Sequence, residues 1–490
     1  MTGRGERKNR LTALPPTLRL LFSLLVILGG ILLLPLGTAV ILGERSEAAA
    51  FAAVAGGSLA VGFLGRTRYR DRAREGVRPA LLCTGAWLLF SLVGAIPFVL
   101  ARGLDPLDAF FETVSGLTTT GITMFSGLDA WPRSLLLWRS LTQWVGGLGI
   151  LTFFLGLSFR GTGDHRLFGA ESHKIELGRP VPGLAHTLRI LWAIYLLLTA
   201  AVGAGLLLAG MTPFDALCHC LTTLSTGGFS PHDASIGFYA GNRAIEWILI
   251  AGMLAGGINF LVHYRLLRGE VKALVDNTEI RYFFFYVAAF SALILLERAG
   301  RTGALSAGDG RGVLFQVSSI LTTTGFATED IGGAFFGPLA RQLFLLMMVI
   351  GGCVGSTAGG FKVLRTAILT REVRRELFQL RISRHAVNPV VVDGKAVPVT
   401  EIRRVGALFF AWISLLLAGG LVTTMFTGLG GLQALSGMAS ALGNVGPCFI
   451  PQGQMAELPG IVKGVYILGM LAGRLEILPV LIFLNPRFWR

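Results

Sequence analysis

The sequence predicts an all-α polytopic membrane protein in which two N-terminal transmembrane helices precede four related repeats. The first observation is composition: of 490 residues, 53% are hydrophobic and only 14% are charged. The mean hydropathy is +0.66, which is typical of a chain with many membrane spans and not of soluble domains. The second observation is a glycine motif that returns four times at a spacing of roughly one hundred residues.

The net charge of +15 does not indicate nucleic-acid binding, because the arginines gather in short loops between apolar runs instead of forming one face. The distribution of arginines among the loops instead indicates which loops lie on the cytoplasmic side of the membrane. The five cysteines are odd in number and lack CxxC spacing, so they indicate neither a disulfide framework nor a zinc site.

Residues 1–78 are interpreted as an N-terminal extension of two helices followed by a basic cytoplasmic loop. The apolar runs are 18–42 and 48–64, and arginines crowd the stretch 66–78. The first run is longer than a signal-peptide core, so we interpret it as an uncleaved span. The positive-inside rule places the N-terminus and the loop in the cytoplasm.

Four repeats follow, at 79–186, 187–281, 282–404 and 405–490. Each is expected to contain a first span, a short amphipathic helix, the glycine motif and a second span. The first spans are 79–100, 187–208, 282–296 and 405–427; the short helices are 106–118, 213–224, 312–322 and 430–442; the second spans are 134–157, 244–267, 338–370 and 460–484. The expected total is ten full spans and four re-entrant segments. The basic loops 159–186, 265–281 and 365–404 then share the cytoplasmic side.

The short helices cannot cross a bilayer, because 13 residues reach only ~20 Å against a hydrocarbon core of ~30 Å. We interpret them as re-entrant pore helices. Backbone that leaves the helix at that depth is tolerated where it lines a protein-enclosed pathway.

The four glycine segments carry the chemistry. They are Thr119, Thr120, Gly121 and Ile122; Ser225, Thr226, Gly227 and Gly228; Thr323, Thr324, Gly325 and Phe326; and Asn444, Val445 and Gly446. The glycines at 121, 227, 325 and 446 are 106, 98 and 121 residues apart. Glycine lets backbone carbonyls turn where other residues resist, so four segments around one axis could replace the water around a small cation. The negative C-terminal ends of four pore helices favour a cation there. The sequence therefore predicts a central ion pore.

Three acidic residues, Asp108, Glu112 and Asp215, lie within the predicted pore helices. We expect them to hydrogen-bond to nearby backbone in preference to contacting the ion.

The second span of the third repeat has 33 residues, which as one helix would be ~50 Å long. Its middle contains Gly351, Gly352, Gly355, Ser356, Thr357, Gly359 and Gly360. We predict a broken helix whose glycine-rich loop, residues 351–360, is a gate beneath the filter; close helix packing is the alternative. Nucleotide binding is improbable, because Phe361 stands where a phosphate loop needs lysine.

Arg474 lies near the middle of the last predicted span. A midplane arginine costs roughly 2.5 to 3.5 kcal/mol and usually faces a cavity or a partner. We expect it to be an electrostatic barrier in the pore; the alternative is an ion pair with another helix. Glu476 is a poor partner, since it lies two positions away on another face.

These motifs, together with the run from Gln143 to Ile150, resemble the Trk/Ktr/HKT potassium transporter superfamily, closest to its bacterial Trk-type membrane subunit. The resemblance implies potassium preference from the four filter glycines, a gate at 351–360 and a pore arginine at Arg474. It also implies a homodimer in the bacterial cytoplasmic membrane and a separate nucleotide-binding regulatory subunit of the RCK/KTN type. The positive-inside rule places both termini in the cytoplasm, the C-terminus through Arg487 and Arg490. The loop 365–404 is the candidate docking surface, or else a lipid-facing run of charge.

The resulting hypothesis is potassium uptake, with K⁺ as the transported ion and no bound cofactor. The alternative is a sodium-selective or poorly selective monovalent cation channel or symporter. An enzyme is disfavoured, because neither an HExxH nor a GxSxG pattern occurs. A purely structural or receptor-like protein would not need four filter copies. Channel and proton- or sodium-coupled symporter both remain open, since each can use the same filter.

Overall fold

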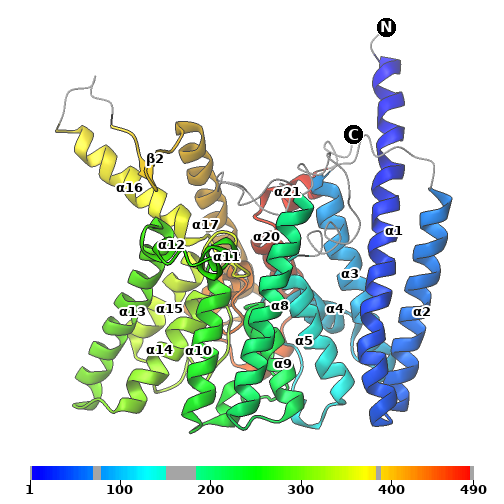
Figure 1. Ribbon diagram of the computed structural model, residues 1–490, viewed down its shortest axis with the longest axis horizontal. Coiled ribbons are helices and arrows are strands. Elements are labelled where there is room, and N and C mark those ends of the chain that lie inside the picture. Colours follow the sequence, from blue (N-terminus) through cyan, green and yellow to red (C-terminus); the bar gives the residue numbers. More distant parts are fainter. Residues whose placement is uncertain (1–2, 70–78, 150–183, 382–387, 486–490) are drawn as a thin grey trace.

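The computed structural model describes residues 3–69, 79–149, 184–381 and 388–485, and its helices run mostly side by side between two ends of the molecule (Figure 1). The only strands in these ranges are the two-residue strands β1 (Val391–Val392) and β2 (Lys395–Ala396), which pair antiparallel. The expected all-helical membrane class is therefore confirmed.

Six helices in the described ranges are long and apolar enough to cross a membrane. They are α1 (Gly3–Leu42), α2 (Arg45–Arg68), α3 (Pro79–Arg102), α8 (Leu184–Leu208), α13 (Thr278–Thr302) and α17 (Val399–Thr427). The α1 and α2 hairpin stands at one side of the molecule (Figure 1). A seventh candidate is a bent pair, α10 (Arg243–Gly257) and α11 (Phe260–Leu267), whose axes differ by 105°.

The predicted second spans are not single helices. They begin with α5 (Arg133–Gly147), α10, α15 (Pro338–Ile350) and α20 (Gly460–Arg474), which have 15, 15, 13 and 15 residues. The break predicted in the third repeat is present, between α15 and α16 (Val363–Gln379). The unbroken spans predicted at 244–267 and 460–484 were wrong, and residues 150–157 of the predicted span 134–157 lie outside the described ranges.

Local chemistry accounts for both unexpected breaks. Asn259 accepts a hydrogen bond from the N–H of Leu261 over 2.8 Å and so starts α11 in a new direction. Between α20 and α21 (Leu478–Leu484), Glu476 and Ile477 have φ angles of 60° and 66°. A β-branched residue in that left-handed region cannot continue a right-handed helix.

The four short helices are α4 (Pro106–Leu117), α9 (Pro213–Leu224), α14 (Ala307–Leu321) and α18 (Gly431–Gly443). Asp105 and Thr212 cap the first two ahead of a proline at the first helical position. The third starts five residues before the predicted position 312, because Ser306 and Asp309 form a capping box. The remaining elements are η1 (Leu128–Ala130), η2 (Ser235–Tyr239), α12 (Lys272–Val275) and α19 (Gln452–Ala456).

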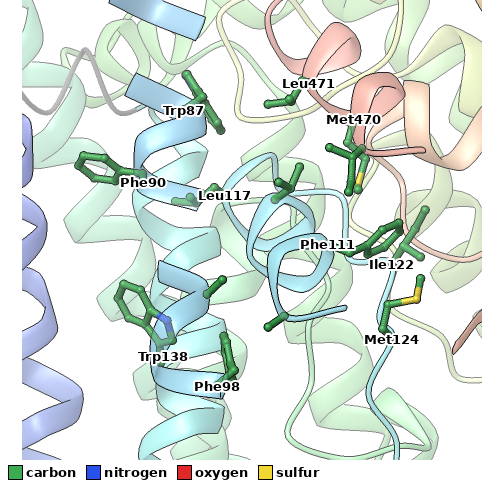
Figure 2. Packing of buried hydrophobic residues seen from close by; sticks show 14 of the residues in the cluster. Trp87, Phe90, Phe98, Phe111, Leu117, Ile122, Met124, Trp138, Met470 and Leu471 are labelled. Carbon is green, nitrogen blue, oxygen red and sulfur yellow. The ribbon is translucent and has the colours of Figure 1, made fainter. Parts of the chain in front are cut away.

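A cluster of large buried side chains holds α4 in place. Figure 2 shows Phe111 of α4 beside Ile122 and Met470, while Trp138 and Phe98 lie beneath. The indole N–H of Trp138 donates to the carbonyl oxygen of Gly94 over 2.9 Å, which satisfies its polar atom inside the core. The first glycine segment therefore leaves a helix whose position is fixed by dense packing.

Candidate functional site

All four glycine segments leave the C-terminal end of a short helix with the same backbone course. The first turn residues, Thr119, Thr226, Thr323 and Asn444, have φ angles of 54°, 52°, 56° and 53°. Two positions later stand Gly121, Gly228, Gly325 and Gly446, with φ angles of 83°, 76°, 87° and 104°. The positive φ at the later position favours glycine, because a residue with a Cβ atom adopts this left-handed backbone conformation only at a cost in free energy.

This course corrects the sequence alignment of the second segment by one residue. Gly228, and not Gly227, has the positive φ and is the counterpart of Gly121. The residues just before the four glycines each donate their N–H to a carbonyl five positions earlier. These hydrogen bonds are Thr120 to Ser115 (2.8 Å), Gly227 to Thr222 (2.9 Å), Thr324 to Ser319 (2.8 Å) and Val445 to Ser440 (3.0 Å).

The four segments contact one another in a closed cycle. A Cβ atom on each glycine would strike the carbonyl oxygen just before the glycine of the next segment. The distances are 2.3 Å from Gly121 to Gly227, 2.0 Å from Gly228 to Thr324, 2.1 Å from Gly325 to Val445 and 2.8 Å from Gly446 to Thr120. Since the fourth contact returns to the first segment, the four carbonyl groups form a ring around one point.

Cavities lie on both sides of this ring. Gly121, Gly228, Gly325 and Gly446 all line one cavity of about 390 Å³. A second cavity, of about 160 Å³, is lined by Arg474 and by the glycine-rich loop. Thr119 and Thr323, at the helix ends of their segments, hydrogen-bond to Arg474 and to the loop. The ring therefore separates the two cavities.

The glycine-rich loop packs directly against the segments. The N–H of Gly359 donates to Oγ1 of Thr323 over 2.6 Å. The Thr357 hydroxyl donates to the carbonyl oxygen of Leu224 over 2.8 Å and also accepts from Thr226 Oγ1 over 3.3 Å. Gly351 has φ 71°, and a Cβ there would lie 2.3 Å from the Gly359 carbonyl oxygen. The loop is thus folded back on itself beneath the ring.

Glu279 ties the glycine-rich loop to the first turn of α16, and sequence reasoning missed it. Its Oε1 accepts from the N–H of Val354 over 2.7 Å and from the N–H of Leu364 over 3.1 Å. The residue is only 4% exposed. The available signal was an acidic residue just before the span predicted at 282–296.

Arg474 is the last residue of α20, at the wall of the second cavity. Its guanidinium donates to the carbonyl oxygens of Gly146 and Gly147, both over 2.5 Å, and of Thr357 over 2.7 Å. Glu476 forms an ion pair with Arg365 at 2.5 Å. Arg474 is therefore tied to backbone carbonyls at the end of α5 and in the glycine-rich loop.

The three acidic residues of the short helices are bound within the protein, but only Glu112 accepts from nearby backbone as expected, whereas the carboxylates of Asp215 and Asp108 bind side chains. Glu112 is 1% exposed, pairs with Arg139 at 2.8 Å and accepts from the N–H of Met124 over 2.9 Å. Asp215 accepts from the hydroxyls of Tyr239 and Thr212. Asp108 pairs with Lys463.

A second ionic cluster lies at the first cavity. Nδ1 of His232 is 2.5 Å from Asp129, its Nε2 is 3.4 Å from Asp215, and its ring stacks on Phe238 at 3.7 Å. Burial alone would lower the pKa of His232, but the interactions with Asp215 and Asp129 outweigh burial and raise that pKa above its ordinary value. His232 thus links η1 to α9.

Comparison with known proteins gives a consistent result. Residues 69–489 match the family described as TrkH, cation transport protein. The chain is 37% identical over 441 residues to the Trk system potassium uptake protein TrkH of Vibrio parahaemolyticus, covering 87% of this chain and 88% of that protein. It is 34% identical over 427 residues to TrkG of Escherichia coli K12, covering 86% of each. The crystal structure of the potassium transporter TrkH from V. parahaemolyticus superimposes with a TM-score of 0.85 at 33% identity, covering 97% of this chain and all of that one.

Proposed function

Because the chain belongs to the TrkH family of cation transport proteins, we propose that it is the membrane subunit of a Trk system that takes potassium into the cell. It is a multi-pass transport protein and not an enzyme.

The observation that carries this proposal is the cyclic contact between each filter glycine and the carbonyl before the next. The carbonyl oxygens of Thr120, Gly227, Thr324 and Val445 are the proposed ring of ligands for a dehydrated potassium ion. The other residues of the four glycine segments supply further carbonyl and hydroxyl oxygens along the pathway. The short helices point their C-terminal ends at the same place, and their partial negative charge favours a cation.

The glycine-rich loop is the proposed gate, and Arg474 is the proposed barrier to cations. Both line the second cavity, and Thr357 of the loop accepts a hydrogen bond from Arg474. An ion that leaves the filter toward this cavity meets the loop backbone and a fixed positive charge. Opening then requires the loop and the guanidinium to move apart.

The proposed architecture is the one expected from the sequence: an N-terminal extension at 1–78 and repeats at 79–186, 187–281, 282–404 and 405–490 around the pore. The start of α1 and the outer end of α16 lie at the same end of the molecule (Figure 1). That end carries the basic residues of α11, α12 and α16, which supports a cytoplasmic location by the positive-inside rule. Both termini are then cytoplasmic, in a bacterial cytoplasmic membrane.

The proposed assembly is a homodimer with a separate cytosolic regulatory subunit. Support for docking at 365–404 comes from the free end of α16. Several arginines lie beside large apolar side chains there. These apolar side chains are 53% to 83% exposed, and they belong to Val373, Leu377, Phe378 and Leu380. Such a mixed basic and apolar surface suits a protein partner.

The test is uptake of potassium or of radiolabelled rubidium into proteoliposomes of the purified full-length chain, with sodium and proton gradients imposed independently. Uptake that depends on the potassium gradient and is not displaced by sodium supports potassium transport. Equal displacement by sodium supports the poorly selective alternative. A requirement for a proton or sodium gradient identifies a symporter, and uptake without either identifies a channel.

A further inference from the structure

The second glycine segment lacks a side chain where the other three have one. Thr120, Thr324 and Val445 precede the filter glycine in the first, third and fourth segments, and Gly227 stands at that position in the second. In the first and third segments the threonine hydroxyl lies 2.7 Å and 2.8 Å from the hydroxyl two positions earlier. Gly227 has no group with which to make this contact.

A glutamine from another repeat fills the vacant space. Gln143 belongs to α5 and is fully buried. A Cβ atom on Gly227 would lie 2.3 Å from Cδ of Gln143 and 2.4 Å from its Oε1. The φ angle of Gly227 is not positive, so this amide, and not the backbone conformation, keeps a side chain out of position 227.

The amide of Gln143 also holds two peptide groups on either side of Gly228. Nε2 donates to the carbonyl oxygen of Gly227 over 2.6 Å, and Oε1 accepts from the N–H of Phe229 over 3.0 Å. One turn earlier on α5, Arg139 donates to the carbonyl oxygen of Ser230 over 3.1 Å. Helix α5 therefore holds the backbone of the second segment and the two residues after it through three hydrogen bonds, at Gly227, Phe229 and Ser230.

We propose that Gln143 is a specificity-determining positioning residue, whose amide replaces the missing side chain of the second segment and fixes the distance of the Gly227 carbonyl from the ion. The inference rests on the proposed function. A carbonyl anchored from behind cannot move inward to a smaller ion, so the ring keeps a width that suits potassium over sodium. Without the anchor, the Gly227 carbonyl approaches sodium and selectivity falls.

The experiment compares uptake of radiolabelled rubidium and radiolabelled sodium by proteoliposomes of the full-length chain and its variants. Loss of one hydrogen bond to a ring carbonyl corresponds to a fall of about tenfold in the rubidium-to-sodium ratio for Gln143→Leu. Gln143→Glu keeps the acceptor for Phe229 but sets a carboxylate against a carbonyl, so the ratio falls as well. The matched control is Gln433→Leu, since Gln433 donates to the carbonyl oxygen of Phe449 over 3.4 Å, away from the ring. Its ratio should equal that of the unaltered chain.

A compensating pair separates positioning from folding. Gly227→Ala alone should abolish uptake, because the new Cβ collides with the amide. Gly227→Thr combined with Gln143→Ala copies the first and third segments, with Ser225 two positions earlier as the hydroxyl partner, and should restore uptake and selectivity. An unchanged rubidium-to-sodium uptake ratio in Gln143→Leu overturns the inference. Full uptake by Gly227→Ala also overturns it, and this second result does not depend on whether Gln143→Leu folds. If the unaltered chain itself fails to favour rubidium over sodium, the proposed function is overturned instead.

Discussion

The guanidinium of Arg474 donates a hydrogen bond to the carbonyl oxygen of Thr357 over 2.7 Å, although the two residues lie 117 positions apart. This bond joins the end of α20 to the middle of the glycine-rich loop, so the two elements that face the second cavity are coupled. The coupling leads to the first two predictions.

Replacing Arg474 by alanine should raise cation flux. Two unit charges ~8 Å apart at an effective dielectric constant of ~20 repel by ~2 kcal/mol, which corresponds to an increase of more than about tenfold. Rubidium uptake by proteoliposomes measures it. Arg474→Lys keeps the charge and should stay close to the resting rate. Normal expression of Arg474→Ala with unchanged flux would contradict a barrier role.

Replacing Glu279 by leucine should also raise resting flux, through the loop instead of the charge. The substitution removes the acceptor for the N–H groups of Val354 and Leu364, and leaving a buried donor without its acceptor costs ~1–3 kcal/mol. Glu279→Gln retains an acceptor oxygen, so its resting flux should lie between that of the unaltered chain and that of Glu279→Leu. The same uptake assay decides, and equal resting flux in all three proteins would show that Glu279 does not restrain the loop.

Gly121→Ser should reduce the preference for potassium over sodium at least about tenfold. The new side chain displaces the Gly227 carbonyl, and the free-energy cost should exceed that of losing one hydrogen bond. The physical reason is the 2.3 Å approach of a Cβ at position 121 to the Gly227 carbonyl oxygen. The matched control is Gly127→Ala, which also has a positive φ, 69°, but has open space around the new Cβ. It should lose ~1–2 kcal/mol of stability and keep its selectivity. Equal selectivity loss in both variants would point to backbone strain and not to the ring.

The stability of the protein should fall as pH rises through the pKa of His232. That pKa is raised above its ordinary value of 6.5, so the stabilisation is fully present below 6.5 and is lost as the imidazole deprotonates above it. The groups that face His232 are Asp129, Asp215 and the Tyr239 ring, with His219 on the neighbouring helix.

The measurement is the melting temperature between about pH 5 and pH 9. His232→Gln should flatten the curve on the alkaline side, whereas His186→Gln, at an exposed position of α8, should leave it unchanged. A wild-type curve that persists in His232→Gln would assign the pH dependence to another group.

Helix starts were determined by the sequence itself. The bounds of α9, Pro213–Leu224, agree with the predicted range, and α4 ends within one residue of its predicted end. A capping side chain followed by proline acts within one turn, so neighbouring residues decide where such a helix begins. The apolar lengths and the fourfold return of glycine are likewise local properties, and they were sufficient for the membrane class.

Only the tertiary structure decided the register of the second segment and the roles of Gln143 and Glu279. The amide of Gln143 occupies the space beside Gly227 from 84 positions away, and Glu279 reaches Val354 across 75. The ring of carbonyl groups itself consists of contacts between different glycine segments. Such contacts form only when distant segments pack, and no neighbouring residue in the sequence encodes them. The glycine segments could therefore be predicted from the sequence, whereas the groups that position them could be identified only in the folded protein.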